Sequence, residues 1–167
     1  KRFYTDLTER AETLAAEHGF PEMKMMYFGF LANLKPDGST SKDLADCLKV
    51  SKQAISKMTQ EIEQLGFIEF HPHATDGRAS VIRLTEKGVL MLRTGLKVSE
   101  QIKAELAEKV GKKALDSMID TLKILVENIR RGISDGHILL NHSFLFLFQY
   151  RKRNINGKIS ITLQKAL

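Results

Sequence analysis

Residues 39–88 constrain the fold more than any other part of the chain, because helix and hairpin signals follow one another there without a gap. Apolar residues recur at helical spacing in 39–50 and again in 51–66. Two segments of strand composition, 67–70 and 80–84, come next, separated by a polar stretch that contains an Asp-Gly turn signal. Two short helices followed at once by a hairpin predict a winged helix-turn-helix.

The ends of these helices are marked by residues that suit helix caps. Thr40 suits the N-cap of the first helix, and Asp43 stands three residues later in the place of the capping-box acid. Ser51 suits the N-cap of the second helix, and Gly66 stands where a left-handed residue is expected at its end. The segment 84–88 (L-T-E-K-G) then closes the hairpin and starts another helix, with its threonine as the cap.

The second helix has an apolar inner face, formed by Ile55, Met58, Ile62 and Leu65, and a polar outer face. Gln can pair with an adenine edge, Lys can donate to guanine acceptors, and Ser adapts to either, so the outer face suits the DNA major groove. Free backbone N–H groups at a helix start also favour a phosphate. A solvated helix presents a similar polar face, so that alternative stays open. The predicted DNA-contacting residues here are Thr40, Ser51, Lys52, Gln53, Ser56, Lys57 and Gln60.

The tip of the hairpin carries residues that favour the DNA interpretation. Arg78 is expected there, flanked by His73 and Thr75. An arginine on a thin hairpin can enter a narrow minor groove, where the negative potential is enhanced. Asp76 can accept a hydrogen bond from the guanidinium group and hold it in position. Asp76 and Arg78 therefore complete the predicted DNA-binding site.

At these residues the chain resembles the MarR family of bacterial transcription regulators. The matching features are S-x-x-x-I-S at 51–56, I-E-x-L-G-F-I at 62–68, the D-G-R tip at 76–78 and the L-T-E-K-G exit at 84–88. Each is short, but their order and spacing over about fifty residues make the combination specific, and a looser likeness covers 1–132. The resemblance implies a homodimeric regulator that binds an inverted-repeat operator and represses transcription by occluding the promoter.

Charge does not by itself decide between functions. The net charge is +6, yet residues 39–88 hold seven basic and seven acidic residues, so the predicted DNA-binding unit is neutral. Two alternatives stay open: an architectural protein that coats DNA without sequence preference, and a winged protein-interaction module that does not bind DNA. The sequence contains no Gly-rich phosphate loop, no G-x-S-x-G and no H-E-x-x-H, so an enzyme is not expected.

Outside the winged unit the pattern is helical. Residues 1–38 predict two supporting helices, the second starting at Pro21, and 89–132 predict two long helices separated by Gly111. The apolar stripes of the long helices exceed what a winged unit can cover, which favours a second copy of the chain; packing on each other within a monomer is the alternative. The resemblance assigns 1–18 and 89–132 to a dimer, with winged lobes on either side.

The resemblance also implies a small phenolic or lipophilic effector, bound between the dimer helices and the DNA-binding lobe. Adaptable methionines suit such a pocket. A Met and aromatic cluster at helical spacing is equally the composition of an ordinary core. The candidate ligand residues are Tyr4, Met25, Met26, Tyr27 and Phe30.

The lone cysteine, Cys47, excludes an intrachain disulfide and fits a reducing, cytoplasmic compartment. We expect it to be buried as a packing residue in the first helix of the helix-turn-helix; a redox switch is the alternative. The histidines lack partners at ligand spacing, so neither a metal site nor a cofactor is expected. The most apolar run, 138–148, is shorter than the roughly 20 residues that span a membrane.

Residues 133–167 form an extension whose composition differs from the helices before it. Strand-like segments flank Asn156-Gly157, which is a two-residue hairpin signal. We expect extra dimer packing from this extension. Phosphate contact through the basic cluster at 151–153 is an alternative, and so is an end that is foreign to the domain.

Overall fold

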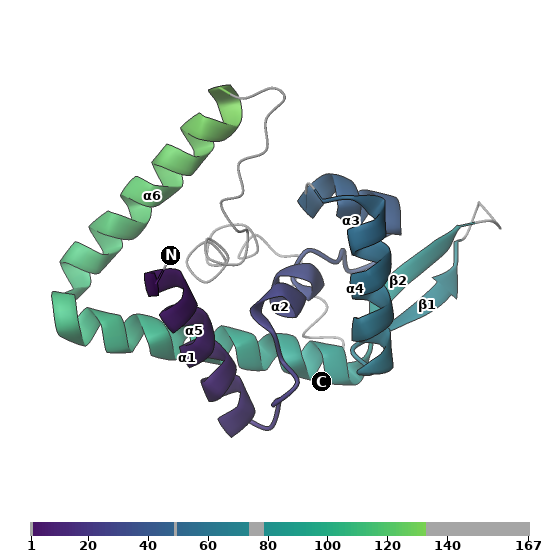
Figure 1. Ribbon diagram of the computed structural model, residues 1–167, viewed down its shortest axis with the longest axis horizontal. Helices are drawn as coiled ribbons and strands as arrows, with labels where there is room; N and C mark the ends of the chain where they lie inside the picture. The colour runs from purple at the N-terminus through teal and green to yellow at the C-terminus, as the bar shows by residue number, and fades with distance from the viewer. Residues whose placement is uncertain (1, 49, 74–78, 133–167) are drawn as a thin grey trace.

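The computed structural model describes residues 2–48, 50–73 and 79–132. Within these residues the chain is mainly helical with one small antiparallel hairpin, so the predicted fold class is confirmed (Figure 1). The extension at 133–167 lies outside the described residues. The elements are α1 (Arg2–Glu17), α2 (Met25–Leu31), α3 (Ser41–Leu48), α4 (Lys52–Gln64), β1 (Ile68–Pro72), β2 (Ser80–Leu84), α5 (Glu86–Val110) and α6 (Lys112–Gly132).

The predicted caps of the helix-turn-helix are confirmed. At the start of α3 the Asp43 backbone N–H donates to Thr40 Oγ1 at 3.1 Å, and the Thr40 N–H donates back to Asp43 Oδ2 at 3.1 Å. At the start of α4 the Ala54 N–H donates to Ser51 Oγ at 3.1 Å. Gly66 follows the end of α4 with φ of 75°, a conformation that glycine adopts at little cost. Local sequence therefore fixes where α3 and α4 begin and where α4 ends.

The L-T-E-K-G segment joins the end of α4 to the start of α5. Thr85 caps α5 by accepting a hydrogen bond from the Gly88 N–H at 3.0 Å, and its hydroxyl donates to the Gly66 carbonyl at 2.6 Å. Lys87 Nζ donates to the Leu65 carbonyl at 2.9 Å, which satisfies a C-terminal acceptor of α4. The first turn of α5 is therefore fastened to the last turn of α4.

The hairpin packs beside these helices as the wing. Its register pairs Ile68 with Leu84 and Phe70 with Ile82, which places these side chains on the same face. Ser39 forms an isolated β-bridge to β2, since its N–H donates to the Ile82 carbonyl at 3.0 Å and the Ile82 N–H donates to the Ser39 carbonyl at 2.8 Å. The segment before α3 is thereby tied to the wing.

One core joins the winged unit to α1, α2 and α5. Leu7, Ala11 and Leu14 of α1 recur at helical spacing and are buried, whereas Phe3 near the start of the helix is 53% exposed. Arg10 of α1 pairs with Glu105 of α5 at 2.6 Å, next to this apolar contact. The largest fully buried side chains include Leu14, Met23, Phe28, Phe30, Leu31, Leu44, Ile55, Ile62, Phe67, Ile82, Met91 and Ile102.

The second helix starts later than predicted, at Met25 rather than Pro21. Lys24 is extended as the N-cap, and the Met25 N–H donates to Glu12 Oε1 of α1 at 3.1 Å. This side chain supplies an acceptor at the start of α2, so a tertiary contact favours the later boundary.

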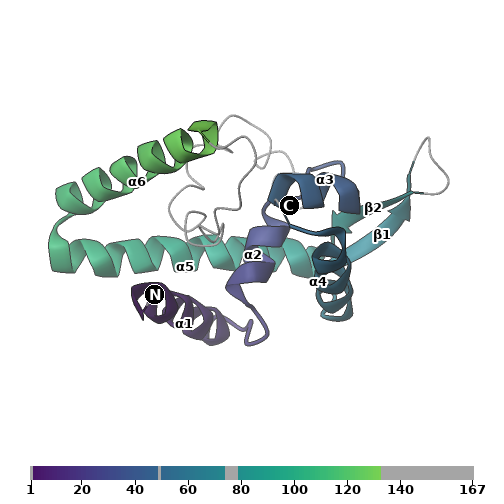
Figure 2. The same ribbon diagram turned by 45° about the horizontal axis from the view of Figure 1, so that its top comes forward.

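The long helix α5 extends away from the winged unit (Figures 1 and 2). The break at Gly111 is confirmed, and α6 turns back from the end of α5. Leu115 and Ile119 of α6 are buried, while Met118 and Leu125 are exposed. Among the described helices, none combines the length and apolar character needed to cross a membrane.

Candidate nucleic-acid interface

The outer face of α4 is the predicted base-reading surface, and its side chains are exposed. Ile55 and Ile62 on the opposite face have relative exposures of 0%, so the rotation of the helix about its axis is fixed by the core. Ser51 also lies exposed, at the start of this surface. The exposed side chains of the outer face are Lys52, Gln53, Ser56, Lys57 and Gln60.

Thr40 is occupied as a helix cap. Its hydroxyl lies 3.0 Å from Asp43 Oδ2, in addition to the reciprocal backbone contacts of the capping box. Hydrogen bonds from Thr40, first from its backbone N–H and then from its hydroxyl, hold the pKa of the Asp43 carboxyl below its ordinary value. An acidic side chain thus lies in the first turn of α3, beside the predicted contact residue Thr40. The DNA contact of Thr40 stays a prediction.

The wing projects beside α4, but its tip at 74–78 lies outside the described residues. The minor-groove contact predicted for Arg78, and its support by Asp76, therefore stay predictions. The described strands lead into that tip, since Pro72 pairs with Ser80 at their open end.

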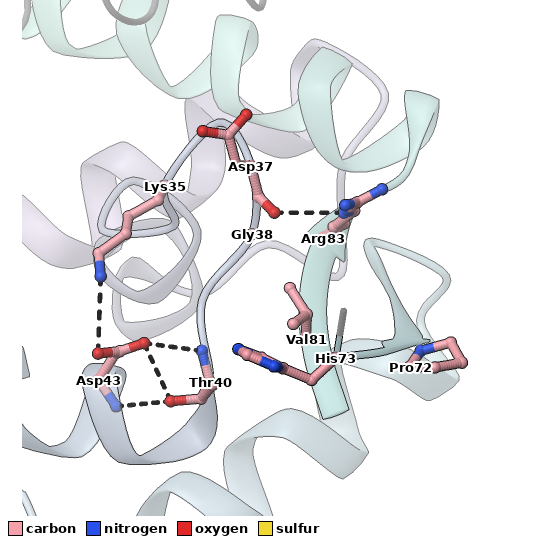
Figure 3. Close-up of a pocket in the computed structure, with 9 residues that line it drawn as sticks. All are labelled: Lys35, Asp37, Gly38, Thr40, Asp43, Pro72, His73, Val81 and Arg83. Atoms are coloured by element: carbon pink, nitrogen blue, oxygen red, sulfur yellow. Dashed lines mark hydrogen bonds and ion pairs between the residues drawn. The ribbon is translucent and has the colours of Figure 1, made fainter. Parts of the chain in front are cut away.

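A surface hollow of about 400 Å³ lies between α3 and the wing, and sequence reasoning missed it (Figure 3). Lys35 Nζ lies 3.6 Å from Asp43 Oδ1, and Arg83 Nε donates to the Asp37 carbonyl at 3.3 Å. The sequence K-P-D-G at 35–38 indicates only a turn, so it gave no reason to place Lys35 at a site. Lys35, Asp37, Gly38, Thr40, Asp43, Pro72, His73, Val81 and Arg83 line the hollow.

The candidate ligand residues do not form one cavity wall. Met25, Tyr27 and Phe30 are buried in the core, Met26 is 48% exposed, and Tyr4 is half-buried on α1. None of them lines the hollow at the wing or a second hollow, of about 230 Å³, between α1 and α5. The effector site at these residues stays a prediction.

The expectation that Cys47 is buried is wrong, because its side chain is exposed. The buried face of α3 is formed by Leu44 and Ala45, and Cys47 lies off that face. Its Sγ lies 3.4 Å from Asn33 Oδ1. Within the described parts of the chain, no group of three His, Cys, Asp or Glu side chains is arranged to hold a metal ion.

Comparisons with known proteins agree with this geometry. Residues 18–79 match a family model described as the MarR family. A comparison with curated proteins finds no match.

Three solved structures share the fold at low sequence identity. The complex of Staphylococcus aureus MepR with DNA has 17% identity and a TM-score of 0.61, over 76% of this chain and 93% of that one. A MarR transcriptional regulator from Methanosarcina mazei Go1 has 20% identity and a TM-score of 0.64, over 78% and 92%. Streptococcus pneumoniae FabT in complex with DNA has 16% identity and a TM-score of 0.57, over 68% and 80%.

Proposed function

We propose that the chain is a DNA-binding transcriptional regulator of the MarR family, whose model matches residues 18–79, and that it represses transcription as a homodimer on an inverted-repeat operator. The observation that carries the proposal is the division of α4 into two faces. Ile55 and Ile62 are fully buried, while Lys52, Gln53 and Lys57 project to solvent. The two lysines can contact phosphates or guanine, and the glutamine amide can contact adenine. Each well-formed bidentate base contact contributes about 1–3 kcal/mol of discrimination between bases.

A homodimer is supported by large apolar side chains that are exposed in the described part of the chain. Val110 is 57% exposed, and Ile124 and Leu125 of α6 are 60% and 51% exposed. These residues lie on α5 and α6, in the segment 89–132 that the family resemblance assigns to the dimer. A second copy can bury them, and two-fold symmetry can place two recognition helices in major grooves about 34 Å apart.

Repression is proposed because a dimer lying across a promoter blocks polymerase by occupancy alone. An activator needs an additional surface that contacts the transcription machinery. A promoter fusion to a reporter gene distinguishes the two, since deletion of a repressor raises reporter output and deletion of an activator lowers it.

A small-molecule effector is the second part of the proposal. The hollow between α1 and α5 supports it, because apolar Phe3, Leu7 and Ile102 lie there beside charged groups of both signs, among them the Arg10–Glu105 ion pair. Apolar walls with a few placed polar groups suit a small phenolic or lipophilic compound. Titration of the protein–DNA complex with a panel of such compounds tests this, and release of DNA at a saturable concentration is the expected result.

The decisive experiment is fluorescence-anisotropy binding to the DNA upstream of the protein's own coding region, at physiological salt with excess non-specific competitor. We expect tight binding that the competitor does not displace, with a stoichiometry of two chains per operator. Binding that the competitor removes would indicate an architectural protein, and no binding even at low salt would indicate a protein-interaction module. Lys57→Ala should weaken binding, and Lys112→Ala, an exposed lysine at the start of α6, provides the matched control.

A further inference from the structure

A buried tyrosine of α2, Tyr27, forms a hydrogen bond to α4, the proposed recognition helix. The Tyr27 hydroxyl donates to Glu61 Oε2 at 2.8 Å, although the two residues are 34 positions apart. Tyr27 is 2% exposed, so its ring is fixed by the core, whereas Glu61 is half-buried near the end of α4. A residue of α2 therefore fixes the position of a carboxylate on α4.

Glu61 lies at the border of the predicted DNA-contacting face. It follows Gln60 directly and comes one helical turn after Lys57, both of which are exposed. An unrestrained carboxylate at this border would add a negative charge close to the DNA phosphates that the face is expected to meet. Repulsion of that kind weakens binding and decreases as salt screens it.

The surroundings of Tyr27 favour a neutral donor beside a positive charge. Burial is the main cause that raises the pKa of Tyr27, so its hydroxyl keeps its proton at neutral pH. Lys24 Nζ lies 5.2 Å from the centre of the Tyr27 ring. The interaction with Tyr27, and more weakly the charge of Glu61, raise the pKa of Lys24. Glu61 is thus held on its α2 side by a hydrogen-bond donor with a cation nearby.

The helix that carries Tyr27, α2, is in turn bonded to α1. Glu12 of α1 accepts the Met25 N–H at 3.1 Å, which fixes the start of α2 two residues before Tyr27. The aromatic ring therefore cannot follow Glu61 without disturbing the contact between α1 and α2.

We propose that Tyr27 is a positioning residue for DNA binding, whose hydroxyl keeps the Glu61 carboxylate turned toward α2 and away from the DNA backbone. This inference rests on the proposed function, since it takes the outer face of α4 as the surface that meets DNA. It assigns Tyr27 a role through Glu61, with no contact of its own to the nucleic acid.

The test compares Tyr27→Phe, Glu61→Gln and the double variant in full-length protein, by anisotropy binding to the upstream duplex at two salt concentrations. Tyr27→Phe frees the carboxylate and should weaken binding about fivefold, on the scale of one solvent-screened charge pair. The loss should shrink at the higher salt. Glu61→Gln removes the charge, so the double variant should regain wild-type affinity.

Rescue by Glu61→Gln is the readout that a merely structural role would not produce. If Tyr27 only stabilised the fold, the double variant would bind no better than Tyr27→Phe. That outcome, or an unchanged affinity of Tyr27→Phe, overturns the inference.

Failure of the inference and failure of the proposed function give different results. If wild-type protein binds the duplex and Lys57→Ala weakens it, the proposed function stands whatever Tyr27→Phe does. If the wild-type protein binds no duplex at all, the proposed function and this inference both fall. Thermal unfolding of each variant, recorded in parallel, identifies any loss of binding that comes from unfolding.

Discussion

Substitution of Gly88 by alanine tests the junction between α4 and α5. A Cβ atom at Gly88 would lie 2.0 Å from the Phe67 carbonyl oxygen and 3.0 Å from its carbonyl carbon. Both are backbone atoms, so the contact cannot be relieved by a side-chain rotation. The first turn of α5 must move away from the end of α4, and the hydrogen bonds that Thr85 makes to Gly66 and Phe67 must lengthen.

The magnitude follows from three opposing contributions. Alanine in place of glycine inside a helix favours folding by about 1 kcal/mol. Overpacking against the carbonyl group costs about 1–3 kcal/mol. The two weakened Thr85 hydrogen bonds each contribute about 0.5–1.5 kcal/mol. For Gly88→Ala we therefore expect a net loss of about 2 kcal/mol in the free energy of unfolding, which lowers Tm by about 4–8 °C in a chain of this size.

Urea unfolding at a fixed protein concentration, followed by circular dichroism, measures this loss. Gly19→Ala is the matched control: Gly19 has φ of 89° and nothing within 4 Å of a built Cβ. Gly19→Ala therefore shows a backbone cost of about 1 kcal/mol without a steric clash, whereas Gly88→Ala shows the clash without that backbone cost. If Gly88→Ala were as stable as the wild type, the close approach of α5 to Phe67 would be refuted.

Four further predictions concern the interface, the caps and pH. Gln53→Ala should lose roughly 1–3 kcal/mol of operator binding and relax specificity at one base pair, measured on single-substituted duplexes; an equal loss on scrambled DNA would contradict base reading. Arg78→Ala should weaken binding and give a shallower salt dependence, and unchanged affinity would exclude the wing tip from binding. Ser51→Ala should destabilise the fold by about 1 kcal/mol in urea unfolding, because it removes the N-cap acceptor of α4, whereas Ser51→Asn should not. Lys87 is the main cause that lowers the pKa of Glu22 from 4.5, at an Nζ–Oε1 distance of 2.8 Å. The Glu22–Lys87 ion pair therefore stabilises the fold above pH 4.5, and this stabilisation is lost as the pH falls through the lowered pKa of Glu22. In a plot of unfolding free energy against pH, Glu22→Gln should therefore reduce the slope on the acid side.

Local chemistry made much of the winged unit predictable. Thr40, Ser51 and Gly66 act through neighbours within a few residues, and the structure has these caps and the left-handed glycine where the sequence placed them. The two faces of α4 were predictable for the same reason, because helical periodicity assigns Ile55 and Ile62 to one side.

Tertiary contacts account for what the sequence did not predict. The start of α2 depends on Glu12, a residue of another helix, and no local pattern identifies that acceptor. Cys47 is exposed because Leu44 and Ala45 define the buried face of α3, which leaves the cysteine beside it. The Tyr27–Glu61 hydrogen bond joins residues 34 positions apart, and neither position showed a pattern that predicts pairing.

The fastening of α4 to α5 gives the long helix the properties of a lever arm. α5 has 25 residues, hence a length of about 37 Å, and its first turn is bonded to the recognition helix through Thr85 and Lys87. A tilt of about 5° at its far end moves the near end by about 3 Å over that length. This displacement is close to the axial rise of one base pair, about 3.4 Å. If the proposed dimer binds two half-sites, the bending stiffness of α5 sets how much variation in half-site spacing that dimer tolerates.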